Sequence, residues 1–122
     1  MNNRAKMRRS NQKAIEFLLQ NGFDAVYLIP HTRYDSFTYL KNTKIRSKDI
    51  LGIADGIAIR NGIVYLIQVK SNSFDGFNKF LSRIRGFNLY GLFLNVKDGN
   101  MIRVREVNPI KVFEWKDIDV VK

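Results

Sequence analysis

Three polar residues near the middle of the chain have the types and spacing that hydrolysis of a phosphodiester needs. Asp55, Gln68 and Lys70 lie in the stretch DILGIADGIAIRNGIVYLIQVK, residues 49–70. A carboxylate binds a hard divalent cation such as Mg²⁺, and the side-chain carbonyl of Gln68 and the main-chain carbonyl of Val69 can complete the protein's share of the ligands. Lys70 can orient or help deprotonate a metal-activated water, or offset charge on a pentavalent phosphate.

The dipeptide Asn61-Gly62 predicts how the chain brings these residues together. Both residues tolerate the positive φ of a two-residue type I′ hairpin turn, and apolar runs flank them. The turn predicts the pairs Arg60–Ile63, Ile59–Val64, Ile57–Leu66, Asp55–Gln68 and Ile53–Lys70. Alternation places the polar members on one face, far from the turn. Both faces are otherwise apolar, which is typical of a central strand that is covered on both sides. Burying polar groups in such a strand costs free energy, so their convergence at its end needs an explanation.

Asp49 competes with Asp55 for the role of metal ligand. The two have the same parity, but six residues of extended strand would separate them by about 20 Å. Both can bind one ion only if the chain bends, for example at Gly52. The pairing with Gln68 favours Asp55. Asp49 stays an alternative ligand, a second-layer group or a residue near the phosphodiester substrate.

Composition limits the class of protein. The chain has 122 residues, 45% of them hydrophobic, which predicts one folded domain over residues 1–122. Cysteine is absent and His31 is the lone histidine, so disulfides, thiolate zinc sites, a cysteine nucleophile and a histidine cluster are excluded. No apolar run reaches the roughly 20 residues of a membrane span, and the N-terminus lacks a signal-peptide core. We therefore expect a soluble cytoplasmic protein without a membrane partner.

The charge of the chain favours a polyanionic partner. Lys and Arg number 21 against 11 Asp and Glu, so the net charge is +10. Nucleic acid is the simplest partner for such a surplus on a small domain. A charge that serves only solubility, or an anionic membrane surface, is the alternative.

Two basic segments are predicted to contact DNA phosphates. The first is an N-terminal arm, residues 1–9, whose cations are Arg4, Lys6, Arg8 and Arg9. The second, residues 31–48, is long for a loop of a compact domain. Its predicted phosphate contacts are Arg33, Lys41, Lys44, Arg46 and Lys48, with His31 as a further, potentially basic residue. Aromatic rings lie among these cations. Either they stack on nucleic acid or they are core residues of a short strand or helix within the segment: Tyr34, Phe37 and Tyr39.

The hydrophobic pattern predicts an α/β fold. A helix is expected from an N-cap at Ser10 or Asn11 to Gln20, followed by a strand over 23–30 and the hairpin. A second helix over about 74–85 and strands over 87–96 and 101–107 follow. A tail, residues 108–122, could add a short strand or a dimer contact formed by an exposed apolar surface around Val112, Phe113 and Trp115. A mixed sheet flanked by helices buries these faces most simply.

In this context, Asp55 followed by the hairpin and Gln68-Val69-Lys70 resembles the PD-(D/E)XK nuclease superfamily, over about residues 10–107. The short basic form is most similar to archaeal and viral Holliday junction resolvases and to the Mrr-like branch of restriction nucleases. The resemblance implies a restriction-endonuclease-like mixed β-sheet flanked by helices, in the order α-β-β-β-α-β-β. It also implies a Mg²⁺-dependent endonuclease, with Mn²⁺ as a substitute, that acts as a homodimer on branched DNA in recombination or repair.

The resemblance also assigns roles to residues. Asp55 would be the metal-binding aspartate, Gln68 would occupy the acid position of the triplet, and Lys70 would be the catalytic lysine. Glutamine in that position occurs in the Mrr-like branch, and one negative charge fewer predicts weaker metal affinity. The family's acid in the first helix is missing from the corresponding turn, Asn11-Gln12. Glu16, one turn later, is the best remaining candidate, with a plain surface role as its alternative.

Three other functions fit the same residues. A non-catalytic nucleic-acid-binding protein on this fold would keep the basic segments and use Asp55 and Lys70 as an ordinary ion pair. A restriction- or repair-type nuclease would act on linear or flapped DNA, and a further alternative acts on RNA. Cleavage assays in Mg²⁺ separate these alternatives from a structure-specific DNA endonuclease.

Overall fold

Helices and strands follow one another along the chain in nearly the order that the hydrophobic pattern predicts. The computed structural model describes residues 3–29, 37–40, 43–46, 49–73, 75–97 and 101–120. The helices in these ranges are α1 (Asn3–Gln20) and α2 (Phe77–Gly86). The strands are β1 (Ala25–Leu28), β2 (Phe37–Leu40), β3 (Thr43–Arg46), β4 (Gly56–Arg60), β5 (Ile63–Ser71), β6 (Tyr90–Val96), β7 (Met101–Val107) and β8 (Lys116–Asp119).

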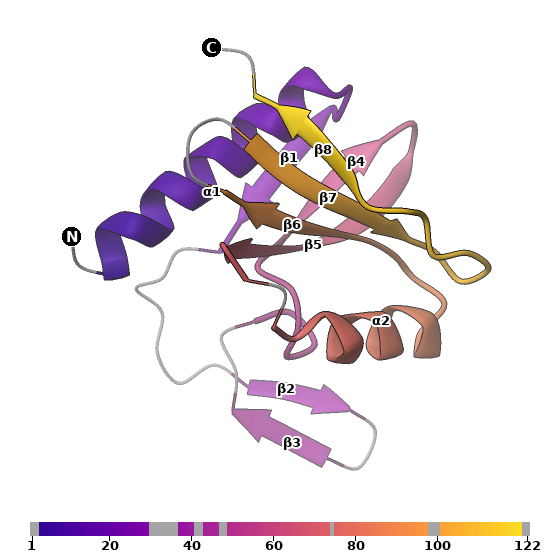
Figure 1. The fold of residues 1–122 in the computed structure, drawn as a ribbon. Coiled ribbons are helices and arrows are strands. Elements are labelled where there is room, and N and C mark those ends of the chain that lie inside the picture. The colour runs from indigo at the N-terminus through magenta and orange to yellow at the C-terminus, as the bar shows by residue number, and fades with distance from the viewer. Residues whose placement is uncertain are drawn as a thin grey trace.

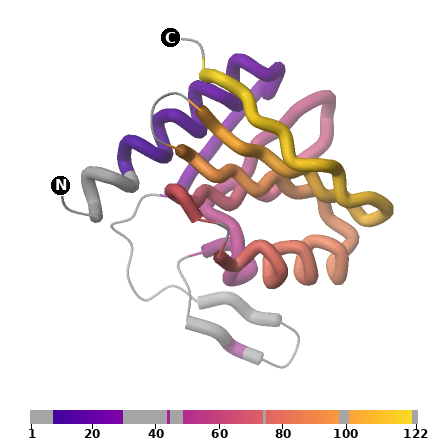
Figure 2. The backbone as a smooth tube through the Cα atoms, in the orientation of Figure 1, coloured from indigo at the N-terminus to yellow at the C-terminus, as the bar shows by residue number. Residues whose placement is uncertain are grey.

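A six-stranded mixed sheet forms the centre of the molecule, in the order β1-β4-β5-β6-β7-β8. Only β5 and β6 run parallel, and α2 is the crossover that joins them (Figure 2). Figure 1 shows α1 and α2 on opposite sides of this sheet. The prediction of an α/β fold with a mixed, helix-flanked sheet is therefore confirmed. Its order α-β-β-β-α-β-β is followed in this sheet, with β8 added.

Each face of the sheet buries its own hydrophobic core, because successive residues of a strand point to opposite faces. On the α1 face, Phe17 and Leu18 pack with Tyr65 and Ile67 of β5. The α2 face has a second cluster, which contains Leu66, Phe80, Ile84, Phe93 and Val107. Gln68 and Lys70 share the parity of Leu66, so they belong to the α2 face.

The register of the central hairpin is confirmed from its turn as far as Gly56, which pairs with Ile67. Asn61 and Gly62 have φ values of 53° and 76°, as a type I′ turn requires. β5 lies between β4 and β6 and is buried on both faces. The prediction of a central, covered strand is therefore also confirmed.

The expected strand over residues 49–55 is not formed. Ile50 makes an isolated antiparallel bridge with Ala54, and the chain turns between them. The turn is left-handed at Leu51 and Gly52, whose φ values are 55° and 71°. Glycine adopts such angles at little cost. The predicted pairing of Ile53 with Lys70 is consequently wrong, and Ile53 is buried in the α2-face core instead.

The N-terminal helix is longer than predicted. It starts at Asn3, so Ser10 and Asn11 both lie in its interior and neither is an N-cap. Lys and Arg are good helix formers, which explains why the basic arm continues the helix. Ser10 is buried, and its hydroxyl forms a short hydrogen bond with that of Ser71 on β5. This contact holds the helix against the end of the central strand.

The basic segment over residues 31–48 contains two of the strands. β2 and β3 pair with each other in a separate two-stranded sheet. Phe37 and Tyr39 belong to β2, so the alternative of a short strand holds for their main chain. Lys44 is exposed on β3, which also contains Arg46. The other predicted residues of the segment lie outside the described ranges: His31, Arg33, Tyr34, Lys41 and Lys48.

The C-terminal tail packs against its own chain. Val112 bridges to Val107, and the Trp115 ring lies 5.4 Å from that of Phe77. Phe113 donates its main-chain N–H to Glu106. β8 is the extra strand that the pattern allowed. The prediction of an exposed apolar surface is wrong, because these side chains are half-buried and cover the sheet.

No helix within the described ranges is long and apolar enough to cross a membrane.

Candidate active site

Asp55 occupies an irregular position directly before β4. Its N–H donates to the carbonyl of Ile67 at 2.7 Å, although Ile67 is already the register partner of Gly56. Two residues therefore face one residue of the neighbouring strand, which is the arrangement of a β-bulge. The carbonyl of Asp55 accepts the N–H of Ile29 at 2.7 Å. The main chain of Asp55 is thus held from both sides, and bulges of this kind are common beside active sites.

The carboxylate of Asp55 is bound to the strand on which Gln68 and Lys70 lie. Its Oδ2 accepts the main-chain N–H of Val69 at 2.7 Å and the Nε2 of Gln68 at 3.2 Å. The N–H and C=O of one strand residue point to the same side. The Val69 carbonyl is therefore directed toward the side of Asp55. The structure brings together Asp55, Gln68 and the main chain of Val69. The predicted register pair Asp55–Gln68 is wrong, because the ladder ends at Gly56–Ile67 and Asp55 lies in the bulge.

Burial raises the pKa of Asp55 from 3.8 to about 6. Loss of hydration is the largest cause, and the hydrogen bond from Val69 opposes it. The negative charge of Asp49 raises the pKa further, whereas the positive charge of Lys70 lowers it. A partly buried carboxyl with such a pKa is typical of functional sites, where the protein keeps an ionisable group away from water.

Lys70 lies two residues beyond Gln68 on the same face and is half-buried. A Cβ placed on Gly76 would lie 3.8 Å from its Cε and 4.0 Å from its Nζ, so the ammonium lies beside the start of α2. In the next strand Lys70 is in register with Asn95, which is 1% exposed. Asn95 accepts the main-chain N–H of Ser73 at 3.0 Å and so orders the chain that follows β5.

The two acids that competed in the sequence lie close enough to interact. The turn at Leu51 and Gly52 replaces the extended strand that would have separated Asp49 from Asp55 by about 20 Å. Asp49 therefore affects the pKa of Asp55 through its charge. The bend that both acids needed in order to share one ion is present.

Glu16 is not brought to this group. It lies on α1, which covers the opposite face of the sheet, and its Oε1 accepts the Nε2 of Gln12 at 3.4 Å. α1 contacts the end of β5 through Ser10, whose hydroxyl bonds to that of Ser71. The expectation that the family's helix acid is replaced by Glu16 therefore has no support in the geometry. Arg8 and Arg9 of the predicted basic arm are exposed, and the main chain of Arg4 and Lys6 belongs to α1.

The donors around Asp55 fit a magnesium ion that keeps most of its waters. Mg²⁺ is commonly bound through one or two carboxylates together with water and substrate phosphate. Asp55 is one carboxylate, and Asp49 is close enough for its charge to act on it. The Val69 carbonyl is directed toward the side of Asp55, and the Gln68 amide faces Asp55 through its Nε2. The described ranges contain no group of three His, Cys, Asp or Glu side chains that could hold a metal. Asp55, whose pKa is raised, and the neighbouring Asp49 nevertheless provide the negative charge that a cation would neutralise.

Three further cations lie near the site and were not selected from the sequence. Arg103 and Arg105 lie on the α2 face of β7, and Lys79 lies on α2. The alternation in MIRVREV could have shown that the two arginines share a face. It could not show that this face is the one that contains Lys70, because that depends on the order of the strands.

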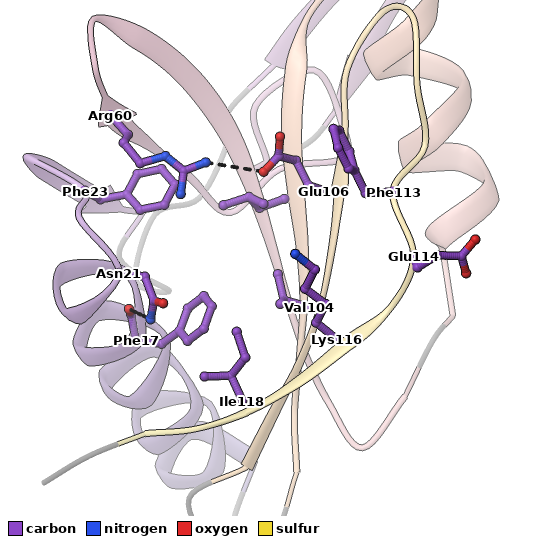
Figure 3. Close-up of a pocket in the computed structure, with 11 residues that line it drawn as sticks. Phe17, Asn21, Phe23, Arg60, Val104, Glu106, Phe113, Glu114, Lys116 and Ile118 are labelled. Carbon is purple, nitrogen blue, oxygen red and sulfur yellow. Dashed lines mark hydrogen bonds and ion pairs between the residues drawn. The ribbon is translucent and has the colours of Figure 1, made fainter.

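A separate pocket of about 220 Å³ lies on the α1 face (Figure 3). Its arginine, Arg60, pairs with Glu106 at 3.3 Å and lies 4.5 Å above the ring of Phe23. Arg60 also donates to the hydroxyl of Tyr65 at 3.2 Å. Arg60, Glu106 and the Tyr65 hydroxyl are thus partners of one another. The pocket is not part of the group around Asp55.

The chain was compared with models of protein families, with curated proteins and with solved structures, and none of the three comparisons gives a match.

Proposed function

We propose that this protein is a metal-dependent endodeoxyribonuclease whose active site lies at the end of the β4–β5 hairpin. One observation carries the proposal. A partly buried carboxylate, Asp55, is held at a bulge by Gln68 and the N–H of Val69, and Lys70 follows on the face of Gln68. An ordinary surface acid would not bear the cost of desolvation that raises its pKa to about 6.

The arrangement of the elements supports the same proposal. β1, β4, β5 and β6 are adjacent in the sheet, with α1 on one face and α2 on the other. This is the helix-flanked mixed sheet that the resemblance to the PD-(D/E)XK superfamily implies. We therefore propose a restriction-endonuclease-like fold for about residues 10–107, with β8 as an addition at one edge.

Each residue of the site has a physical role in the proposed reaction. Mg²⁺ held by Asp55 and the carbonyls of Gln68 and Val69, with Asp49 nearby, would activate a water and polarise the phosphate. Asp55 must be ionised to bind a cation, so its side chain is competent above about pH 6. The ammonium of Lys70 offsets negative charge on the phosphate oxygens and orients the attacking water. Gln68 keeps the Asp55 carboxylate oriented through its amide N–H.

The absence of an ion pair between Asp55 and Lys70 favours an enzyme over the binding-protein alternative. That alternative would use the two residues as an ordinary pair. Both residues are described, and no ion pair joins them; ion pairs of the described side chains include Arg60 with Glu106 and Arg103 with Asp117. Lys70 is instead directed toward the start of α2. Its ammonium is therefore available to a substrate.

We further propose branched DNA as the substrate and a homodimer as the active form. The net charge of +10 supports a polyanionic substrate. Exposed Arg8, Arg9 and Lys44 add positive charge outside the active site. Two sites in one dimer would make paired nicks across a four-way junction. Action on linear or flapped DNA is the alternative that the choice of substrate tests.

The experiment is cleavage of four labelled DNAs: a four-way junction, a flap, a linear duplex and a single strand. Each is incubated with Mg²⁺, Mn²⁺ or EDTA. Asp55→Asn and Lys70→Met should each reduce the rate about 100-fold or more. Asp24→Asn and Lys116→Met are matched controls, because both residues are exposed and distant from the site.

The results separate the alternatives. Cleavage that survives in both variants would show that the assigned site is wrong. DNA binding without cleavage by any form of the protein would support the non-catalytic binding protein. Preference for RNA in a competition assay would point to the RNA alternative.

A further inference from the structure

Arg103 and Arg105 lie on the same face of the sheet as the proposed active site. The register runs from Lys70 to Asn95 and then to Arg103. In the neighbouring row it runs from Gln68 to Phe93 and then to Arg105. Residues in register on adjacent strands share a face. The two arginines are therefore two strands, or about 10 Å, from Lys70 and Gln68.

A groove of about 630 Å³ lies between these arginines and the start of α2. We call it the α2–β7 groove, and it is lined by residues 75–79 together with Arg103, Arg105 and Trp115. Gly76 belongs to its wall and also lies beside the end of the Lys70 side chain. The groove therefore begins where the proposed active site ends.

The groove is held open by fixed side chains. Arg103 binds both oxygens of Asp117, at 2.6 and 2.9 Å. Arg105 donates its Nε to the carbonyl of Phe113 at 2.8 Å, and its guanidinium carbon lies 5.0 Å from the Phe77 ring centre and 5.3 Å from that of Trp115. These contacts immobilise both guanidinium groups before any ligand binds, so little entropy is lost on binding.

The charge of the groove is positive. Within the described ranges no carboxylate pairs with Arg105, and Lys79 is exposed at the groove's edge. Asp75 is the one acid that lines it. The first turn of α2 contains no acidic residue, so the positive end of the helix adds to the same field. Cations beside an aromatic ring match the phosphates and bases of a nucleic-acid strand.

We propose that the α2–β7 groove binds the phosphates of the single DNA strand that continues from the active site, with a neighbouring base against Trp115. The proposal rests on the proposed function, because it makes the groove the subsite for nucleotides next to the scissile phosphate. Arg105 and Lys79 bind phosphate oxygens, and Arg103 adds charge while Asp117 holds it in place. A single strand fits better than a rigid duplex, since its bases are free to reach an aromatic side chain in a groove.

Trp115 makes the proposal directly measurable, because it is the only tryptophan of the chain. The full chain in EDTA is titrated with an unlabelled oligothymidylate while the tryptophan emission is recorded. EDTA prevents metal-dependent cleavage, so the signal reports binding alone. We expect saturable quenching, and we expect the affinity to fall with salt as phosphate contacts require.

Variants then assign the contact to the groove. Arg105→Gln should raise the Kd about tenfold, the effect of losing a charge-assisted hydrogen bond. Lys79→Gln should raise it about threefold and lower the slope of log Kd against log salt by about 0.7. Lys116→Gln is the matched control. Lys116 follows Trp115 in the chain but lines the pocket on the opposite face, so its loss should leave the Kd within twofold (Figure 3).

The outcomes decide the proposal even if one variant is unstable. Arg105 supports the fold through its hydrogen bond to Phe113, so the thermal unfolding of Arg105→Gln is measured first. Lys79 is exposed, so Lys79→Gln gives the independent test. Equal affinities for Lys79→Gln, Lys116→Gln and wild type would overturn the proposal. So would DNA binding, shown by anisotropy of a labelled strand, that leaves Trp115 emission unchanged. An acidic peptide that displaces the strand with higher affinity would indicate a protein partner instead.

The groove proposal and the nuclease proposal can be rejected independently of each other. Weakened binding in the groove variants, with no cleavage by any form, would retain the groove and reject the nuclease. Cleavage that depends on Asp55 but not on Arg105 or Lys79 would retain the nuclease and reject the groove.

Discussion

Replacing Asp55 with Asn should stabilise the protein above pH 6. Burial raises the pKa of this carboxyl from 3.8 to about 6. The rise corresponds to about 3 kcal/mol of folding free energy that is lost when the group ionises in the folded state. Asparagine carries no charge and keeps an oxygen that can accept the N–H of Val69. The variant therefore avoids most of this cost.

The pH dependence has a definite sign. Below about pH 4 the carboxyl is protonated in both the folded and the unfolded chain, and the two proteins should have similar stability. Between about pH 4 and pH 6 the unfolded chain loses its proton while the folded chain keeps it, so wild-type stability falls as pH rises. Above pH 6 the full difference of about 3 kcal/mol remains.

Urea unfolding at pH 4 and pH 8 measures this difference, and thermal unfolding should show a Tm about 10 °C higher for Asp55→Asn at pH 8. Asp24→Asn, at an exposed aspartate, is the control and should change stability by less than about 0.5 kcal/mol. Added Mg²⁺ should stabilise the wild type at pH 8 and leave Asp55→Asn unchanged. The desolvation argument would be refuted if Asp55→Asn were less stable than wild type at pH 8. It would also be refuted if the difference in unfolding free energy between the two proteins were the same at both pH values.

Two further predictions concern the site and the sheet beside it. Gln68→Glu adds a second negative charge next to Asp55, so it should lower the free energy of unfolding in EDTA at pH 8 by about 1 kcal/mol or more. The variant should also bind Mg²⁺ more tightly than wild type, which a titration of the unfolding transition with the metal would show. Gly56→Ala should cost about 3 kcal/mol in urea unfolding, because its Cβ would lie 2.0 Å from the carbonyl oxygen of Tyr27. Gly86→Ala meets no atom within 4 Å and should not destabilise; equal effects of the two alanines would contradict the close β1–β4 contact.

The hairpin was the most predictable part of the molecule because its information is local. Asn61 and Gly62 are adjacent in the chain and accept the positive φ of the turn. A two-residue turn leaves one register for the strands that flank it. The observed pairs from Arg60–Ile63 to Gly56–Ile67 follow from this alone.

The bulge at Asp55 could not be predicted in the same way. Alternation placed Asp55 opposite Gln68 in a regular ladder, whereas its main chain bonds to Ile67 and Ile29. The partner strand β1 is distant in sequence, and its contact decides where the ladder ends. The left-handed turn at Leu51 likewise moved Asp49 toward the site, although leucine gives no signal for such a turn.

The fold class and the proximity of Asp55 to the strand of Gln68 and Lys70 were predictable, since they depend on residue type, alternation and one tight turn. Which face each residue occupies relative to the helices was decided by the tertiary structure. Glu16 and Lys70 are separated because α1 and α2 cover opposite faces, and Arg105 joins the face of Lys70 because β6 lies between β5 and β7. Strand order depends on long-range packing, and no local pattern in the chain contains it.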